Sequence, residues 1–315
     1  MRANIMMLWG DQASQAMSQA VQEVLGDLAV AFGHSFVFRE ERFAEASIQS
    51  YDSPMTQETV EACLESNAVL AVSRTGEGLM ALAAGLSAIQ GSFHYDFPAC
   101  LQPNSLLKSD ALPRGCISYP LSVEAQPLKS AMRIALRQAG QSLRHIPMAG
   151  RSRSDWEDAL RQAMMDVPAV KVSTGETTEI LQLLIEAPDS LGHLFAPPTQ
   201  ALVLDSAARA VSGLQSLVRE RFTSDRPIVF ASRILGELPD GDGPFGLLYA
   251  AADMLAGALK LPREAECLRT STTNVLDAGW RTPDIAVAGS PRIGTSAICG
   301  LIGEQISLAG QLLTH

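Results

Sequence analysis

The chain has 315 residues, of which 47% are hydrophobic and 18% charged, so it can bury a sizeable core and is too apolar to be disordered. Its net charge of −10 and isoelectric point near 5.0 argue against nucleic acids and anionic membranes as partners, because phosphate binding needs a positive field. The apolar run before Asp11 is too short for a signal peptide, and no segment reaches a membrane-spanning length. The five cysteines lack zinc-ligand spacing, which favours buried thiols in a reducing compartment and a cytoplasmic protein.

Apolar runs alternate with amphipathic stretches, which predicts an α/β protein. In chain order, the first half predicts a strand over Ile5–Trp9, a helix over Ala13–Phe32, a strand over Ser35–Phe38, a helix from Thr56 to Glu65, a strand over Asn67–Ser73, a helix over Gly78–Gln90 and a strand over Ser92–Phe97. The remainder predicts helices over Leu128–Leu143 and from Ser154, a strand over Ala169–Ser173, helices over Glu176–Glu186 and Leu202–Arg221, a strand over Pro227–Ser232, and helices over Leu247–Leu259, Arg263–Ala278 and Thr295–Leu313. The strand, tight turn and helix at the start are the order in which nucleotide-binding units begin.

Four segments together resemble the isopropylmalate/isocitrate dehydrogenase family, the β-decarboxylating dehydrogenases. They are "IMMLWGDQ" and the stretches Tyr51–Ser73, Gly78–Lys108 and Asn274–Ile302. The resemblance implies an α/β fold of two domains that share a continuous sheet. The first domain would comprise residues 1–98 plus 228–315, and the inserted second domain, residues 99–227, would carry the dimerisation helices. Few residues separate Leu121 from Leu128, where the family carries a β-arm, so we expect the dimer arm to be shortened or absent.

The reaction implied by the resemblance oxidises a 2-hydroxy acid with NAD(P) and then releases CO₂. It needs arginines for the substrate carboxylates, a Mg²⁺ or Mn²⁺ ion, and a tyrosine and lysine for proton transfer. Two of the arginine positions read Ala83-Ala84 and Phe93-His94, and no arginine lies between Arg114 and Arg133 where a third should stand. Without guanidinium groups that grip carboxylates in pairs, recognition of a malate-type substrate is expected to be lost.

The proton-transfer groups of the family are also missing from their expected places. Tyr119 lies at the end of a predicted strand, and the segment Met148–Arg153 contains no lysine. Arg151 lies in that segment, where it could contact an anion but would be a poor acid or base. His94 and Tyr95 lie on the strand where an arginine would point into the cleft, so His94, Tyr95 and Arg151 are the candidate catalytic residues. The alternative for His94 is a strand-end histidine whose hydrogen bonds are satisfied.

The metal and cofactor motifs that the resemblance implies are incomplete. Of the two aspartates in the family's metal-binding helix start, Asp205 matches the second, whereas Ala201 replaces the first. The position that a partner subunit would supply offers Glu176 as its one carboxylate. Hard divalent ions take several oxygen ligands, so Asp205 predicts a weak metal site at most, one that we do not expect to function.

The NAD loops have lost their distinctive residues. The glycine-rich first turn reads Gly10-Asp11-Gln12-Ala13-Ser14, which removes the close backbone approach that glycine permits. The adenosine loop keeps Ser232 but carries Arg233 and Ile234 at distinctive positions. Asp11, Ser232 and Arg233 are therefore predicted to be remnants of a cofactor site, and we expect no bound cofactor.

These observations predict a divergent homodimeric member of the family without NAD- and metal-dependent oxidative decarboxylation. Such a pseudoenzyme would bind a small ligand in the interdomain cleft or serve as a structural or regulatory partner; Leu202–Arg221 is the candidate dimer helix, and ordinary core packing is its alternative role. The alternative function is an oxidoreductase that acts on a less anionic hydroxy acid with altered NAD(P) binding and Mg²⁺ or Mn²⁺. A third possibility is new chemistry around His94, Tyr95, Asp96 and Arg151. The sequence identifies neither the ligand nor the pathway.

Overall fold

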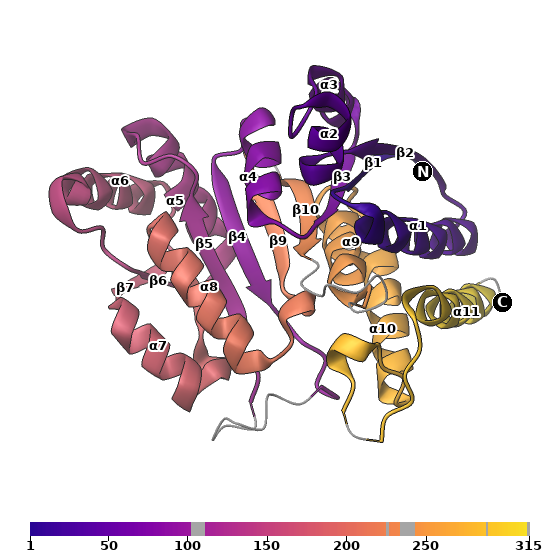
Figure 1. The fold of residues 1–315 in the computed structure, drawn as a ribbon. Helices are drawn as coiled ribbons and strands as arrows, with labels where there is room; N and C mark the ends of the chain where they lie inside the picture. Colours follow the sequence, from indigo (N-terminus) through magenta and orange to yellow (C-terminus); the bar gives the residue numbers. More distant parts are fainter. Residues whose placement is uncertain (102–110, 225–226, 234–242, 288, 314–315) are drawn as a thin grey trace. The chain divides into compact units, whose positions relative to one another are not determined.

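The structure is a computed structural model that describes residues 1–101, 111–224, 227–233, 243–287 and 289–313 (Figure 1). The chain divides into two compact units, residues 1–87 with 226–315 and residues 88–225. Both ends of the chain therefore build the first unit, and its middle builds the second. In the described part of the chain, no helix is long and apolar enough to cross a membrane.

The first unit contains a parallel sheet with the strand order β2-β1-β3-β10. Its strands are β1 (Arg2–Trp9), β2 (Ser35–Arg42), β3 (Ala68–Ser73) and β10 (Pro227–Arg233). Every residue of β3 is buried, as expected for a strand covered on both faces. The α/β class predicted from the alternating pattern is confirmed.

Seven helices of the described residues accompany this sheet. They are α1 (Gln12–Phe32), α2 (Ala44–Tyr51), α3 (Gln57–Glu65), α4 (Gly76–Gly85), α9 (Phe245–Gly257), α10 (Pro262–Asp277) and α11 (Thr295–Leu313). Helix α1 packs against α11, and α9 packs against β10 and α10 (Figure 1). The N-terminus of α1 is fixed by Asp11, whose side chain accepts a hydrogen bond from the Ser14 backbone N–H. Its C-terminus is fixed by Gly33, which has a φ of 68°.

The second unit contains a mixed sheet with the strand order β9-β4-β5-β8-β6-β7. Its strands are β4 (Gln90–Tyr95), β5 (Gly115–Pro120), β6 (Ser142–His145), β7 (Lys171–Thr174), β8 (Gly192–Phe195) and β9 (Arg219–Thr223). Strand β4 is antiparallel to both of its neighbours, whereas β5, β8, β6 and β7 run parallel to one another.

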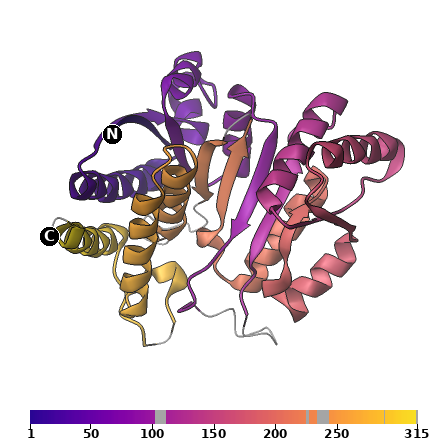
Figure 2. The ribbon, with the colours of Figure 1, turned by 180° about the vertical axis from the view of Figure 1, so that it is seen from behind.

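Helices cover both faces of the second sheet. They are α5 (Ala125–Ala139), α6 (Arg153–Asp166), α7 (Thr177–Glu186) and α8 (Pro198–Ser212). Figure 1 shows α7 and α8 on one face, and Figure 2 shows α5 and α6 on the other, each pair closing its own apolar cluster. Residues 121–124 alone join β5 to α5, which leaves no room there for a β-arm.

Three predicted helices are too long. The helix predicted over Gly78–Gln90 ends at Gly85 as α4, and Gln90 already belongs to β4. The helix predicted over Leu202–Arg221 is wrong in its C-terminal part, because α8 ends at Ser212 and Gly213 follows it in the left-handed conformation with a φ of 68°. The chain then forms β9, which pairs with β4. Likewise α5 ends at Ala139 before Gly140, so Leu143 lies in β6 rather than in a helix.

Candidate functional site

The carboxyl edge of the first sheet is the usual place for a ligand in a fold of this type. Strand β1 has β2 on one side and β3 on the other, so the chain reverses its direction of winding between β1 and β3. Parallel α/β sheets bind ligands in the crevice outside the strand ends at such a point. Asp11 follows β1, Arg74 follows β3, and Ser232 and Arg233 end β10. The three predicted cofactor residues therefore end up at one edge of one sheet.

Asp11 is engaged by groups of its own unit. One carboxylate oxygen accepts hydrogen bonds from the backbone N–H and the hydroxyl of Ser14, both at 2.7 Å, and the other accepts from Arg74 Nε at 2.5 Å. Burial alone would raise the pKa of this carboxyl group. The Ser14 hydrogen bonds and the Arg74 guanidinium outweigh that effect and hold the pKa of Asp11 below its usual range. Asp11, a predicted remnant of a cofactor site, thus caps α1 and pairs with Arg74.

Other polar groups lie at the same edge of the sheet. Thr75 Oγ1 donates to a carboxylate oxygen of Glu45 at 2.7 Å, and a Cβ atom added to Gly76 would come within 3.0 Å of the Arg233 guanidinium. Ser232 is buried within β10. At this edge Asp11 is therefore held by Ser14 and Arg74, and Thr75 by Glu45.

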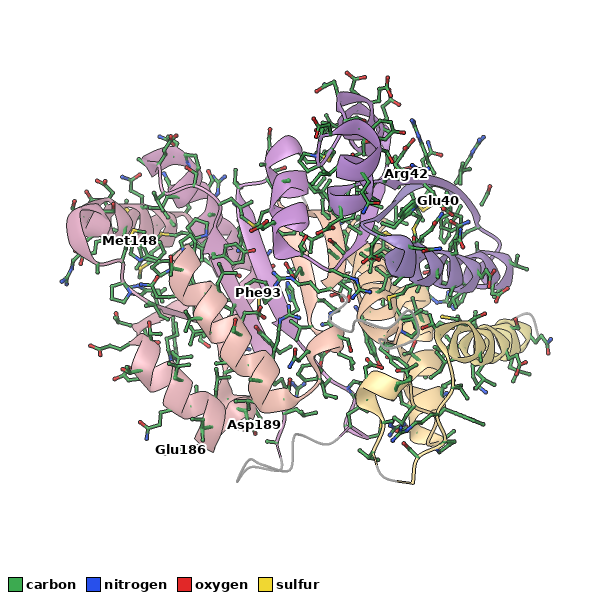
Figure 3. All side chains as sticks on the ribbon, viewed as in Figure 1. Glu40, Arg42, Phe93, Met148, Glu186 and Asp189 are labelled. Atoms are coloured by element: carbon green, nitrogen blue, oxygen red, sulfur yellow. The ribbon has the colours of Figure 1, made fainter. Side chains whose placement is uncertain are left out.

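His94 lines a pocket in the second unit with a volume of about 470 Å³. Its Nε2 lies 2.9 Å from Ser92 Oγ and 3.9 Å from Cys116 Sγ. The pocket opens beside the first residues of β5 and β8, at the end of the sheet opposite the carboxyl ends of these parallel strands. Asp189, which follows α7 (Figure 3), is exposed and lines this pocket.

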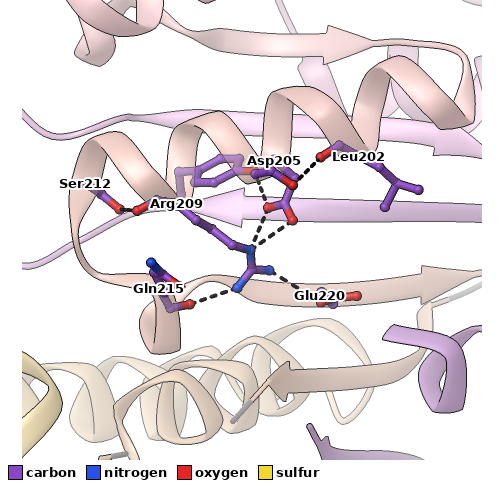
Figure 4. A network of polar contacts seen from close by, with 8 residues as sticks. Leu202, Asp205, Arg209, Ser212, Gln215 and Glu220 are labelled. Carbon is purple, nitrogen blue, oxygen red and sulfur yellow. Dashed lines mark hydrogen bonds and ion pairs between the residues drawn. The ribbon is translucent and has the colours of Figure 1, made fainter. Parts of the chain in front are cut away.

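Tyr95 belongs to a buried polar network on the opposite face of β4. Figure 4 shows the part of this network around Asp205 and Arg209 of α8. The Tyr95 hydroxyl donates to Asp205 at 2.6 Å, and Arg209 Nε lies 2.9 Å from both oxygens of that carboxylate. Arg209 also donates to the Gln215 carbonyl at 2.8 Å and to Glu220 at 3.4 Å. Burial, reinforced by the Asp205 charge, raises the pKa of the Tyr95 phenol well above its ordinary value. This tyrosine therefore remains protonated.

The structure does not bring the three predicted catalytic residues together. His94 and Tyr95 are adjacent on a strand, so their side chains leave opposite faces of the sheet. Phe93 shares the face of Tyr95 and lies beside α8, with the Arg209 guanidinium carbon 5.9 Å from its ring centre (Figure 3). Arg151 has its backbone in the turn Gly150–Ser152, and its side chain lies outside the described residues.

A divalent cation does not fit the network around Asp205. Both carboxylate oxygens face a guanidinium that is permanently charged, and the aspartate is 2% exposed. Across the described ranges, no three histidine, cysteine, aspartate or glutamate side chains are arranged to hold a metal. The sequence analysis missed Arg209, although four residues separate it from Asp205 and this spacing places the two on one face of a helix. It also missed Arg74, for which the sequence offered no signal.

The chain is similar to dehydrogenases in sequence. A sequence profile of the isocitrate/isopropylmalate dehydrogenase family matches residues 4–110. The 3-isopropylmalate dehydrogenase of Synechocystis sp. is 25% identical, with 96% of this chain and 97% of that protein covered. The 3-isopropylmalate dehydrogenase of Halalkalibacterium halodurans is 24% identical, with 97% and 98% covered. The likeness extends over nearly the whole length of both proteins, at low identity.

Solved structures share the fold. The isocitrate dehydrogenase from Methylococcus capsulatus superimposes with a TM-score of 0.77 at 13% identity, covering 97% of this chain and 99% of that one. The TT0538 protein from Thermus thermophilus gives a TM-score of 0.79 at 14% identity, covering 99% of this chain and 70% of that one. At such identities the likeness establishes the architecture alone.

Proposed function

Because the chain is a divergent member of the isopropylmalate/isocitrate dehydrogenase family, we propose that it retains the fold without the NAD- and metal-dependent oxidative decarboxylation. In this proposal the protein is a pseudoenzyme that acts by binding a small molecule or a partner. The observation that carries the proposal is the commitment of Asp205, the aspartate that matches the family's metal-binding motif, to Arg209.

The chemistry of the pair supports this proposal. Arg209 places a permanent positive charge against both oxygens of Asp205 and reaches Glu220 as well. A divalent cation would have to displace this guanidinium before it could reach the oxygens of Asp205 and Glu220. Arg209 thus neutralises the carboxylates in the way that a bound cation would.

The test is a combined assay of binding and turnover. Calorimetric titration with Mn²⁺ and thermal-shift measurements with NAD and NADP should give no saturable binding. No reduced cofactor should form with isocitrate or 3-isopropylmalate. A matched pair sharpens the metal arm: Arg209→Gln removes the competing cation and should allow Mn²⁺ to stabilise the protein, whereas Arg161→Gln, an exposed residue of α6, should not. Turnover of either hydroxy acid by the wild-type protein would overturn the proposal.

A second candidate function is an oxidoreductase that binds NAD(P) differently and acts on a less anionic hydroxy acid. It is favoured by the charged groups at the point between β1 and β3, where Asp11 and Arg74 remain partly exposed. A thermal shift with NAD or NADP that is abolished by Arg74→Gln would support this function over the first.

We further propose a cytoplasmic homodimer. Helices α7 and α8 leave Ile185, Leu202 and Val203 about half exposed, which is apolar area that a second copy could cover. None of the five cysteines forms a disulfide in the described structure, as in a reducing compartment. Light scattering should give twice the mass of the chain, and a monomeric mass would contradict the dimer.

A further inference from the structure

The pocket around His94 has a floor of unusual composition. Arg219 of β9, His94 of β4, Cys116 of β5 and His193 of β8 are paired in register across four adjacent strands. Paired residues lie on the same face of a sheet, with neighbouring Cβ atoms about 5 Å apart. The four side chains therefore form a continuous polar row, and all of them line the pocket.

The row carries positive charge and no carboxylate. Arg219 is 6% exposed, and its Nη1 donates to the Asp96 carbonyl at 3.2 Å. Two residues further along β9, on the same face, Arg221 has a buried Nε without a hydrogen-bond partner in the described structure. Burial lowers the pKa of His193, and the Arg221 charge lowers it further, so this imidazole is mainly neutral at pH 7. Cys116 is buried, which raises the pKa of its thiol and keeps it uncharged.

The acidic side chains of the pocket lie at its mouth. Asp96 and Asp189 are exposed there, together with Arg114. The backbone of Arg114 is fixed by hydrogen bonds with Pro188 and Gly192, so the base of its side chain is held beside the opening. An anionic group that reaches the floor meets the charge of Arg219 there, whereas a second anionic group left beside Asp96 and Asp189 would be repelled.

We propose that this pocket binds a small molecule through a single oxyanion group, a carboxylate or a phosphate, held above the row by Arg219 and Arg114 and hydrogen-bonded by His94 and His193. Guanidinium groups recognise both oxyanions through charge-assisted hydrogen bonds, and a volume of about 470 Å³ suits a small metabolite. This inference assigns a pocket and a ligand class to the small-molecule role proposed above. Its biological role rests on that proposed function, whereas oxyanion binding itself does not.

The experiment follows the imidazole groups of the full chain by NMR while inorganic phosphate, and separately acetate, is added at constant ionic strength. Of the five histidines, His94 and His193 should show saturable shifts. Arg114→Gln should weaken binding by about tenfold, which corresponds to one charge-assisted hydrogen bond. The exposed Arg161→Gln should leave the affinity unchanged.

Arg219→Gln should abolish the shifts; because Arg219 is buried, the exposed Arg114 decides the outcome if that variant fails to fold. Shifts that do not saturate, or an affinity that Arg114→Gln leaves unaltered, would overturn the inference. Phosphate binding without acetate binding would assign the site to phosphorylated ligands, and the reverse would assign it to carboxylates. The turnover assay is a separate measurement, so failure of the oxyanion site leaves the proposed loss of catalysis standing.

Discussion

The two units hold an aspartate and an arginine together in contrasting ways. In the second unit, Asp205 and Arg209 lie on successive turns of α8 and are 2% and 6% exposed. Asp205 also accepts a hydrogen bond from Tyr95, and Arg209 also pairs with Glu220. In the first unit, Asp11 meets Arg74 across the ends of two strands, and both side chains remain partly in water. Removing one partner of a buried pair leaves an uncompensated charge, whereas solvent compensates a partly exposed one. The buried pair Asp205–Arg209 therefore stabilises the fold, whereas the partly exposed pair Asp11–Arg74 can be altered with a small loss of stability.

Among the substitutions that test this difference, Arg209→Met should have the largest effect on stability. The substitution leaves the carboxylates of Asp205 and Glu220 buried without their cation, and it should lower the free energy of unfolding by about 3–5 kcal/mol. Urea denaturation measures this loss. The exposed pair of Arg161 and Asp158 on α6 provides the matched control, because Arg161→Met should change stability by less than about 0.5 kcal/mol. An equal loss of unfolding free energy in the two variants would contradict the proposed difference between buried and exposed pairs.

Tyr95→Phe should have an intermediate effect. It removes the hydroxyl that donates to Asp205 while keeping the buried ring, so the expected loss is about 1–3 kcal/mol. Tyr51→Phe, at an exposed position on α2, is the control and should be neutral. A neutral result for Tyr95→Phe would mean that the guanidinium alone satisfies Asp205.

Asp11→Asn should have the smallest effect, below about 1 kcal/mol, because asparagine also caps helices and the ion pair is partly exposed. Its value lies in its pH dependence. The pKa of Asp11 is lower in the folded than in the unfolded protein, so its charge stabilises the fold above the ordinary aspartate pKa of about 3.9. This contribution is lost as the pH falls through the lowered value. Denaturation of both proteins between neutral pH and pH 3 should show their stabilities converging; a constant difference would contradict the assignment.

Sequence reasoning succeeded where the signal is local. The buried run that became β3 and the turn before α1 are short patterns, and the structure has both. The end of α8 was missed although Gly213 is a visible helix stop, because Leu214, Leu217 and Val218 beyond it continue a helical spacing. In the structure these residues lie in and beside the short 3₁₀ turn Gln215–Leu217, and β9 follows. Strand identity there depends on pairing with β4, which a linear pattern does not contain.

The candidate sites were harder to predict for the same reason. Asp205 and Arg209 are four residues apart and could be read as a pair, but Tyr95 is 110 residues away from Asp205. The polar row of Arg219, His94, Cys116 and His193 arises from the register of four strands. His94 stood out as a histidine at a changed motif position, whereas nothing in the sequence linked it to His193.

The alternation of β4 has a consequence for how this molecule can change. His94 and Tyr95 follow one another in the chain, but their side chains leave opposite faces of the sheet. The imidazole lines the pocket, whereas the Tyr95 hydroxyl donates to Asp205 under α8. Mutations can therefore remodel the pocket while the ion pair that anchors α8 persists. The same geometry constrains the register of β4 in the sheet, because a shift by one residue would bury an imidazole against Asp205 and expose a phenol.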